Sequence, residues 1–297
     1  MKPRSEITHI PVLLREVLEF LSPKQNQTMI DGTVGQGGHA LAIVERLLPD
    51  GRLLCIDRDP VNLATAKERL NQYQKNVVFA QDSFANIKKI AYVHGFTSVS
   101  GILLDLGFST AHLEDAGRGF SFQREGPLDM RYDPNQILTA AVIVNEWSKE
   151  DLAKIFRQYG EELQAEKVAV AIVQTRASAP LRTTAQLAEL VASVIRRRGK
   201  IHPATRVFQA LRIAVNDELG QLRQALLDML ELLAPGGRLA IISFHSLEDR
   251  IVKDFFKTQA IIKIKQITKR IVTPEQEEIF RNPRARSAKL RVVERLD

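Results

Sequence analysis

The sequence predicts an α/β protein with a mostly parallel sheet and an inserted helical subdomain. Over the first hundred residues, short apolar runs alternate with helix-like stretches of about ten or more residues, which is typical of βαβ units. This alternation stops after residue 110, and an apolar strand pattern returns only at residue 238. We therefore expect a sheet domain made of residues 1–115 and 205–297, with a helical insert at 116–204.

The N-terminal apolar runs share one feature, an aspartate at or just beyond the end of each run. The runs cover 29–30, 53–56, 77–80 and 102–104, and the aspartates are Asp31, Asp57, Asp82 and Asp105. Helices are expected between the runs, at 39–48, 61–73 and 84–94. In parallel α/β sheets, ligands bind beyond the carboxyl ends of the strands. The aspartates therefore mark the expected position of a functional site.

The segment that interrupts the alternation begins with residues 115–133, which are rich in glycine, arginine and phenylalanine and are expected to form an ordered loop. Helical patterns continue from 140 to 198 without a strand signal, and Trp147 within them is expected in a core. The basic run 196–200 is interpreted either as a solvated helix end or as a phosphate contact.

The sheet pattern returns in the last third of the chain. A long amphipathic helix is expected over 205–234 and is ended by the Pro-Gly-Gly sequence at 235–237. A strand at 238–243 and a helix at 247–257 follow. Residues 288–294 alternate with period two, and we expect them to form an edge strand.

The overall composition is that of a soluble globular protein, with 44% hydrophobic and 26% charged residues among 297. Cys55 is the single cysteine, which excludes an internal disulfide and favours a reducing compartment. The sequence has no signal-peptide pattern and no apolar run of about 18 to 20 residues that could span a membrane. We expect a cytoplasmic protein.

The positive charge is concentrated near the end of the chain. The net charge is +7, and residues 257–297 hold eleven Lys and Arg against five Asp and Glu, a surplus of six. Such an asymmetry favours a polyanionic partner, nucleic acid before acidic protein, although a solvated basic surface would give the same composition.

A glycine-rich turn, DGTVGQGGH at 31–39, joins the first strand to the first helix. Glycines such as Gly35, Gly37 and Gly38 let the backbone turn sharply and let a ligand approach the main chain, but several nucleotide-binding classes share this pattern. Asp31 discriminates between them, because its carboxylate would repel a pyrophosphate and would attract a cationic ligand. This favours S-adenosylmethionine, whose ammonium and sulfonium groups are cationic, over a nicotinamide dinucleotide.

Three further residues of this half are candidates for the same site. Asp57 ends the second strand and can accept hydrogen bonds from both ribose hydroxyls. On spacing alone, His39 is interpreted as the start of a helix. Phe84 either stacks on adenine or fills the core.

The fourth strand ends in LLDLGFS at 103–109, which carries the groups that methylation of a base amine requires. The lone pair of such an amine is delocalised into the ring, so the enzyme must accept hydrogen bonds from the NH₂ group and align the nitrogen with the methyl donor. Asp105 and the carbonyl of Leu106 are the expected acceptors, and Phe108 is expected to stack on a flipped base. Taken alone, Asp105 would equally fit a carboxylate that contacts the cofactor or caps the backbone.

No metal site is expected. His202 and His245 lie in polar segments, but they have no cysteine partner and no ligand-like spacing. They are interpreted as structural histidines or as RNA contacts.

Motifs in order along nearly the whole chain resemble the ribosomal RNA small subunit methyltransferase H family. They are HIPVLL (9–14), DGTVGQGGH (31–39), IDRDP (56–60), LLDLG (103–107), RGFSFQREGPLDMR (118–131), HPATRVFQALRIAVNDEL (202–219), ISFHSLEDRIV (242–252) and NPRARSAKLR (282–291). The resemblance implies methylation of N4 of a cytosine in the decoding region of 16S rRNA. It also implies a class I methyltransferase (Rossmann-like) fold with an inserted helical domain for substrate recognition.

The resemblance also implies which residues contact S-adenosylmethionine. They are Gly37, Gly38, His39, Asp57, Phe84 and Asp105, which assigns His39 and Phe84 to the site. The family usually has a glutamine where this chain has His112, and the histidine can donate one hydrogen bond at that contact. The implied partner is 16S rRNA, within the small ribosomal subunit, and a homodimer is an open alternative.

Two other function classes remain as alternatives. A ribosome-assembly factor would bind RNA and hold S-adenosylmethionine without catalysis, and the retained LLDLG strand end argues against it. A nicotinamide-dependent oxidoreductase is disfavoured by Asp31 and by the basic C-terminal region.

Overall fold

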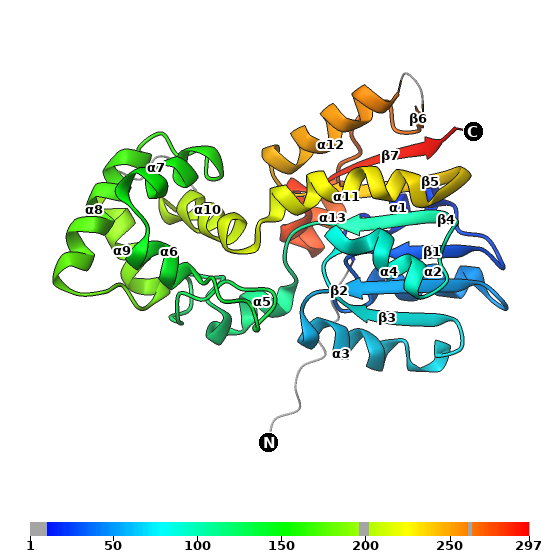
Figure 1. The fold of residues 1–297 in the computed structure, drawn as a ribbon, viewed down its shortest axis with the longest axis horizontal. Coiled ribbons are helices and arrows are strands. Elements are labelled where there is room, and N and C mark those ends of the chain that lie inside the picture. Colours follow the sequence, from blue (N-terminus) through cyan, green and yellow to red (C-terminus); the bar gives the residue numbers. More distant parts are fainter. Residues whose placement is uncertain (1–10, 196–201, 261–262, 297) are drawn as a thin grey trace. The chain divides into compact units, whose positions relative to one another are not determined.

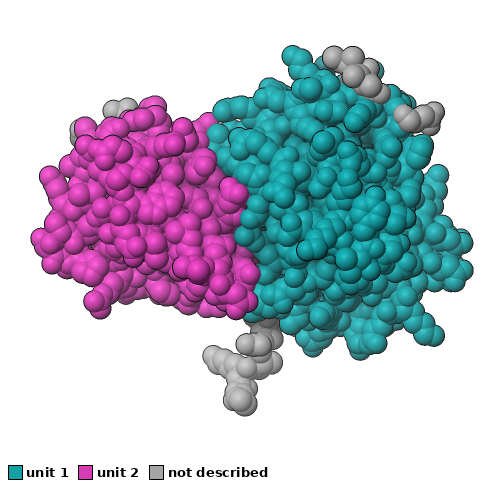
Figure 2. Space-filling model, in the orientation of Figure 1, with its two compact units in different colours: residues 1–108, 219–297 teal, residues 109–218 magenta. Residues whose placement is uncertain are grey.

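The computed structural model describes residues 11–195, 202–260 and 263–296 of the chain. Two compact units are present: a first unit of Met1–Phe108 with Leu219–Asp297, and a second unit of Ser109–Glu218, coloured teal and magenta in Figure 2. The basic run 196–200 and the start of the 9–14 motif lie outside the described residues.

The first unit is built on a seven-stranded sheet with the order β3-β2-β1-β4-β5-β7-β6 (Figure 1). The first five strands in this order are parallel, and β7 is antiparallel to both of its neighbours. The strands are β1 (Thr28–Asp31), β2 (Arg52–Asp57), β3 (Val77–Gln81), β4 (Val99–Asp105), β5 (Leu233–Ser243), β6 (Ile264–Gln266) and β7 (Lys289–Arg295). The predicted α/β fold with a mostly parallel sheet is confirmed.

Helices cover both faces of this sheet, because successive apolar residues of each strand point to opposite sides. Ile30 and Leu54 pack with residues of α4, α11 and α12 in one core cluster. Met29 and Leu53 pack with residues of α1, α2 and α3 in another. These helices are α1 (Leu14–Leu21), α2 (Gly38–Leu47), α3 (Pro60–Arg69), α4 (Ile87–Val93), α11 (Glu218–Leu232) and α12 (Ser246–Gln259).

The helix expected over 205–234 is in fact two helices, α10 (Ala204–Asn216) and α11. Asp217 separates them in the left-handed conformation, with φ 47°. The buried Asn216 side chain accepts the N–H of Tyr132 at 2.9 Å and donates to the carbonyl of Met130 at 2.7 Å. These tertiary bonds hold the chain at the break, which an amphipathic sequence pattern does not reveal. The Pro-Gly-Gly sequence lies in the first part of β5, after the end of α11.

The prediction that the last strand lies at the edge of the sheet is wrong. β7 lies between β5 and the three-residue strand β6, and β6 forms the edge. Leu290, Val292 and Val293 of β7 are fully buried. The alternation identified a strand correctly, but it does not show what covers the strand's outer side.

The second unit is helical, with its own buried core. It contains α5 (Thr110–Glu114), α6 (Ala140–Glu146), α7 (Lys149–Gln158), α8 (Ala165–Ser178), α9 (Thr184–Val194) and α10. The segment 115–133 is an ordered loop as predicted, with Phe120, Leu128 and Met130 buried in that core. Trp147 packs against it, also as predicted. No helix in the described parts of the chain is long and apolar enough to cross a membrane.

Candidate active site

Three predicted aspartates lie at the carboxyl ends of adjacent strands. Asp31 ends β1, Asp57 ends β2 and Asp105 ends β4, and β1 lies between the other two strands. The parallel register brings all three side chains to one edge of the sheet. Asp82 follows β3, and its N–H donates to the carbonyl of Asp57 at 3.1 Å.

The glycine-rich turn after β1 has the backbone conformation that its glycines permit. Gly35 and Gly37 have φ of 51° and 80°, a region that side chains with a Cβ rarely adopt. A Cβ on Gly37 would also lie 3.3 Å from the Cα of Ala66 on α3. Gly38 begins α2 and packs closely against Pro11. The turn is therefore held against α3 and leaves main-chain groups at the strand ends.

The carboxylate of Asp57 is fixed by main-chain donors on both oxygens. Oδ2 accepts the N–H of Gly35 at 2.8 Å, and Oδ1 accepts the N–H of Asp59 at 2.8 Å. Asp59 in turn caps α3, because its side chain accepts the N–H of Val61, and Pro60 occupies the first turn. Oδ2 also accepts from Nδ2 of Asn62 at 3.5 Å. Asp57 is thus oriented in advance for a ligand with neighbouring hydroxyls.

Asp31 is buried, with 1% of its surface exposed. Burial raises the pKa of Asp31 to about 7, the Asp57 charge adds to the rise, and the Thr33 N–H, which donates to Oδ1 at 3.1 Å, opposes it. Near neutral pH this carboxyl is therefore close to half ionised. A bound cation would favour its charged form.

Asp105 lies in an environment that favours its protonated form. Its main-chain N–H donates to Oγ1 of Thr33 at 2.6 Å. Its side-chain Oδ1 is buried and accepts no hydrogen bond from the described residues, while Oδ2 lies 3.7 Å from Nδ1 of His39. Burial, followed by the charges of Asp31 and Glu248, raises the pKa of Asp105 well above its usual value. A buried acceptor without a donor is costly unless a ligand supplies the donor.

The residues after Asp105 form the turn that leaves the sheet. The N–H of Leu106 donates to the carbonyl of Ile242 at 2.9 Å, which ties the turn to β5. Gly107 has φ 103°, and a Cβ there would lie 3.4 Å from the Phe244 ring. Phe108 is the last residue of the first unit and is 38% exposed.

Phe84 fills part of the core, and its stacking on adenine stays a prediction. Its half-buried side chain packs against the core cluster that includes Ile30 and Leu104. It also lies beside the turn, since a Cβ on Gly32 would be 3.6 Å from the Cβ of Phe84.

The comparison with known families decides the assignment. The model of the MraW methylase family matches residues 6–296. The chain belongs to the MraW methylase family. Membership confirms the expectation of a methyltransferase with S-adenosylmethionine as its cofactor, and of a class I methyltransferase fold around the sheet described above.

Relatives of this methylase are similar over almost their whole length. A protein of Thermomicrobium roseum called ribosomal RNA small subunit methyltransferase H is 50% identical, over 97% of this chain and 94% of that protein. The protein of the same name from Heliobacterium modesticaldum is 46% identical, over 97% and 98%. Among solved structures, a Streptococcus mutans protein in complex with SAH is 16% identical over 97% of this chain and 99% of that one, with a TM-score of 0.49.

The residues of this methylase fit a cationic cofactor on three observations. The turn at 31–39 lies beside Asp57, and two carboxyls, the buried Asp31 and the half-buried Asp105, lie at the same edge of the sheet. Asp105 also has a buried oxygen that lacks a donor among the described residues. Each feature suits a ligand that brings positive charge and N–H donors.

His112 lies in the second unit, and its contacts there are the following. Its Nδ1 accepts the N–H of Ser109 at 3.0 Å and completes a cap of α5. Its ring lies 4.8 Å from that of Phe120 and 5.1 Å from that of Tyr132. Because Nδ1 accepts, the proton of a neutral His112 is on Nε2. Its role as a cofactor contact stays a prediction.

The basic C-terminal region divides into paired and exposed cations. Lys289 and Arg291 both form ion pairs with Asp249, at 3.6 and 2.7 Å. The segment 263–272 instead carries four exposed cations and no acidic residue, and it follows the outer side of β7. These cations are Lys263, Lys265, Lys269 and Arg270. Lysines on an edge strand also discourage aggregation, so exposure alone does not assign them to RNA.

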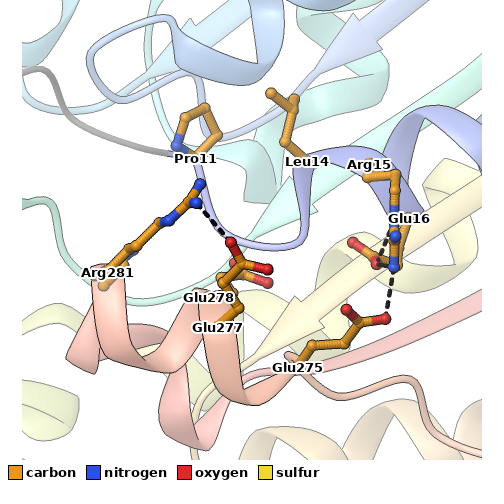
Figure 3. A pocket seen from close by; sticks show the side chains of 9 residues that line it. Pro11, Leu14, Arg15, Glu16, Glu275, Glu277, Glu278 and Arg281 are labelled. Atoms are coloured by element: carbon orange, nitrogen blue, oxygen red, sulfur yellow. Dashed lines mark hydrogen bonds and ion pairs between the residues drawn. The ribbon is translucent and has the colours of Figure 1, made fainter.

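A pocket of about 260 Å³ lies between α1 and α13 (Gln276–Arg281), and none of the predicted site residues lines it (Figure 3). Its charges largely satisfy one another: Arg15 bonds Glu16 and Glu275, each at 2.8 Å. Glu278 accepts the N–H of Leu13 at 2.7 Å. These contacts connect α1 to α13, and we interpret the pocket as structural.

Two residues of the site were not found from the sequence. Thr33 accepts the Asp105 N–H, and the buried Glu248 accepts the N–H of Phe244 at 2.8 Å and contributes to the electrostatics of Asp105. Thr33 lies in the turn already singled out. Glu248 occupies the third position of α12 after His245, where a capping box is expected to place a glutamate.

Proposed function

We propose that this methylase transfers a methyl group from S-adenosylmethionine to N4 of a cytosine in the decoding region of 16S rRNA, in the cytoplasm. One observation carries the chemical part of the proposal. Asp105 has a buried oxygen without a described donor, at the end of a strand and directly before a main-chain carbonyl. The relatives named for the small ribosomal subunit support the choice of RNA.

In this proposal the first unit holds the cofactor through four features. Asp57 accepts the ribose hydroxyls while the Gly35 N–H keeps it oriented. Asp31 supplies negative charge for the cationic part of the ligand, and Phe84 lies against the adenine. Main chain at Gly37 and Gly38 contacts the ligand, while their missing side chains let the turn pack closely against Ala66 and Pro11. S-adenosylmethionine, when bound, supplies an electrophilic methyl group.

Asp105 and Leu106 prepare the amine for attack. The carboxylate of Asp105 and the carbonyl of Leu106 each accept one N–H of the cytosine amine, which directs the nitrogen lone pair out of the plane of the ring. Phe108 stacks on the flipped base. Positioning of this kind, together with proton removal, typically accelerates such steps by about 10² to 10⁴. We further propose that the helical region at 116–204 contributes substrate recognition, and that the assembled small subunit is the substrate.

The decisive experiment incubates the purified protein with S-adenosylmethionine carrying a labelled methyl group and small subunits from a strain that lacks this modification. Naked 16S rRNA serves as the second substrate. We expect label in the RNA and N4-methylcytidine after nuclease digestion and mass spectrometry. Tight binding of subunits without transfer would support the assembly-factor alternative, and a different methylated nucleoside would contradict the choice of N4.

A further inference from the structure

His39 connects the glycine-rich turn to the acceptor carboxyl. It is the second residue of α2, directly after the turn, and only 6% of its surface is exposed. Its two ring nitrogens have different neighbours. Nε2 lies 2.9 Å from the carbonyl oxygen of Val12, and Nδ1 lies 3.7 Å from Oδ2 of Asp105.

The contact with Val12 determines the protonation pattern of the ring. A carbonyl oxygen can only accept, so the hydrogen bond requires a proton on Nε2. In the neutral ring the other nitrogen, Nδ1, is then the one without a proton. The basic nitrogen of His39 therefore faces Asp105 and no longer competes for the Val12 contact.

Methylation of an amine creates a proton that the site must remove. The nitrogen lone pair forms the new bond to the methyl carbon, and the electron pair of the broken carbon–sulfur bond stays on sulfur. The nitrogen is then cationic and loses one proton to its hydrogen-bond acceptor, Asp105. No other reactant is needed for this balance.

We propose that His39 is a positioning residue for the transfer step, which receives through Asp105 the proton that the cytosine amine loses. The inference rests on the proposed function. The imidazolium and carboxylate that result form an ion pair, and the Val12 carbonyl stabilises the cation through Nε2–H. The present 3.7 Å separation has to shorten to about 2.8 Å for this hand-over, a movement within the reach of a side-chain adjustment.

The charges of Asp31 and Glu248 favour a proton on Asp105, and a second base beside this carboxyl offers the proton another location. Asp31 on β1 and Glu248 on α12 both act on Asp105, and Arg69 on α3 lies beside Gly38. A proton left on Asp105 would neutralise the group that must accept the next amine. Transfer to Nδ1 restores the carboxylate and keeps the positive charge next to it.

Two substitutions separate this role from a structural one. His39→Gln keeps an N–H donor near the position of Nε2 for Val12 but has no basic nitrogen at Nδ1. His39→Asn keeps a polar atom near Nδ1 but loses the bond to Val12. His94→Gln is the matched control, since His94 caps the end of α4 and belongs to none of the proposed contacts.

The measurement is single-turnover methyl transfer to small subunits, at saturating cofactor and RNA, from about pH 5 to about pH 9. For wild type we expect a rate that rises with pH as the pair releases its proton, and then levels. His39→Gln should be about 10 to 100 times slower on the plateau. The rising part of the pH–rate profile of His39→Gln should move to lower pH. In wild type one proton can be on Asp105 or on His39, and the variant lacks the second form, so it releases this proton at lower pH.

Two further readouts do not depend on turnover. Affinity for S-adenosylhomocysteine, measured by calorimetry, gives any loss of cofactor binding in His39→Gln separately from the loss on the plateau, and it sets the saturating cofactor concentration. In the ligand-free protein, nitrogen NMR of His39 should show the proton on Nε2, and Asp105→Asn should change the titration of Nδ1.

The outcomes are distinct. Transfer at the wild-type rate by His39→Gln, or an unshifted rising limb, would overturn the inference. A wild-type rate in His39→Gln together with a loss in His39→Asn would indicate a structural role, in which only the bond to the Val12 carbonyl matters. Absence of transfer by the wild-type protein would instead contradict the proposed function.

Discussion

Replacing Asp31 by asparagine should separate two effects of this buried carboxyl: the free energy of unfolding that it costs and the cofactor affinity that it provides. The asparagine introduced by Asp31→Asn keeps an oxygen that can accept the Thr33 N–H, which lies 3.1 Å from Oδ1 in the native protein, but it cannot ionise. In the native protein burial raises the pKa of Asp31 from 3.8 to about 7. The unfolded chain has the ordinary pKa, so folding takes up a proton between these two values.

The sign and size of the effect on stability follow from this difference. As the pH rises from about 4 to about 7, the unfolded chain loses its proton first, which lowers the free energy of unfolding. The full shift of about three pH units corresponds to about 4 kcal/mol, of which about 3 kcal/mol falls between pH 5 and pH 8. The free energy of unfolding of Asp31→Asn should therefore decrease by about 3 kcal/mol less than that of wild type over this interval.

Cofactor binding should respond in the opposite direction. The ammonium group of S-adenosylhomocysteine prefers ionised Asp31, so the affinity of wild type for this ligand should rise by up to about tenfold per pH unit towards pH 7 and then level. Asp31→Asn should bind with little pH dependence and about tenfold or more weakly at pH 8. At pH 8 Asp31→Asn would then be more stable than wild type but would bind the cofactor more weakly.

Urea unfolding of the ligand-free protein and calorimetric titration test these two expectations at each pH. Asp50→Asn, at an exposed carboxyl, is the control and should behave like wild type. If Asp31→Asn shows the wild-type pH dependence of stability, the carboxyl does not hold a proton below pH 7. Unchanged affinity at pH 8 would remove Asp31 from the cofactor site.

Three other substitutions test the remaining assignments. Asp57→Ala should cost about 2 to 4 kcal/mol of S-adenosylhomocysteine affinity, because two charge-assisted hydrogen bonds are lost, and a change within a factor of about two would exclude the role. Asp105→Asn should slow saturated single-turnover transfer by about 10² or more while cofactor affinity changes much less, whereas a wild-type rate would restrict Asp105 to cofactor binding. Neutralising Lys265, Lys269 and Arg270 together should flatten the dependence of log K for RNA on log salt by about 0.7 to 0.9 per lost phosphate contact, and an unaltered slope would mean that these cations are only solvated. The matched control carries the same changes at three exposed lysines elsewhere: Lys67, Lys75 and Lys89.

The sequence was most informative where a local pattern has a single structural solution. Buried parallel strands must be apolar on both faces, so the runs that end at Asp31, Asp57 and Asp105 predicted both the strands and the edge at which the aspartates meet. The turn at 31–39 was predictable for a similar reason, since glycine adopts the positive φ of Gly35 and Gly37 without steric cost.

Features that depend on tertiary contacts were not predictable. The end of α10 is determined by the bonds of Asn216 to the loop at 130–132, which are distant in sequence. The position of β7 inside the sheet depends on β6, and the pairing of Lys289 with Asp249 removes a cation that composition alone counts as available. The role inferred for His39 depends on which ring nitrogen contacts the Val12 carbonyl, and residue spacing in the sequence does not reveal this.

The contacts of the Val12–Leu13 segment have a consequence for folding during synthesis. The carbonyl of Val12 holds His39, while the N–H of the next residue, Leu13, donates to Glu278 near the other end of the chain. A growing chain contains the glycine-rich turn and β4 once about a third of it has been translated, but Leu13 meets its acceptor only after Glu278 has left the ribosome. Incomplete chains therefore carry the glycine-rich turn without the full support of the segment that contacts His39.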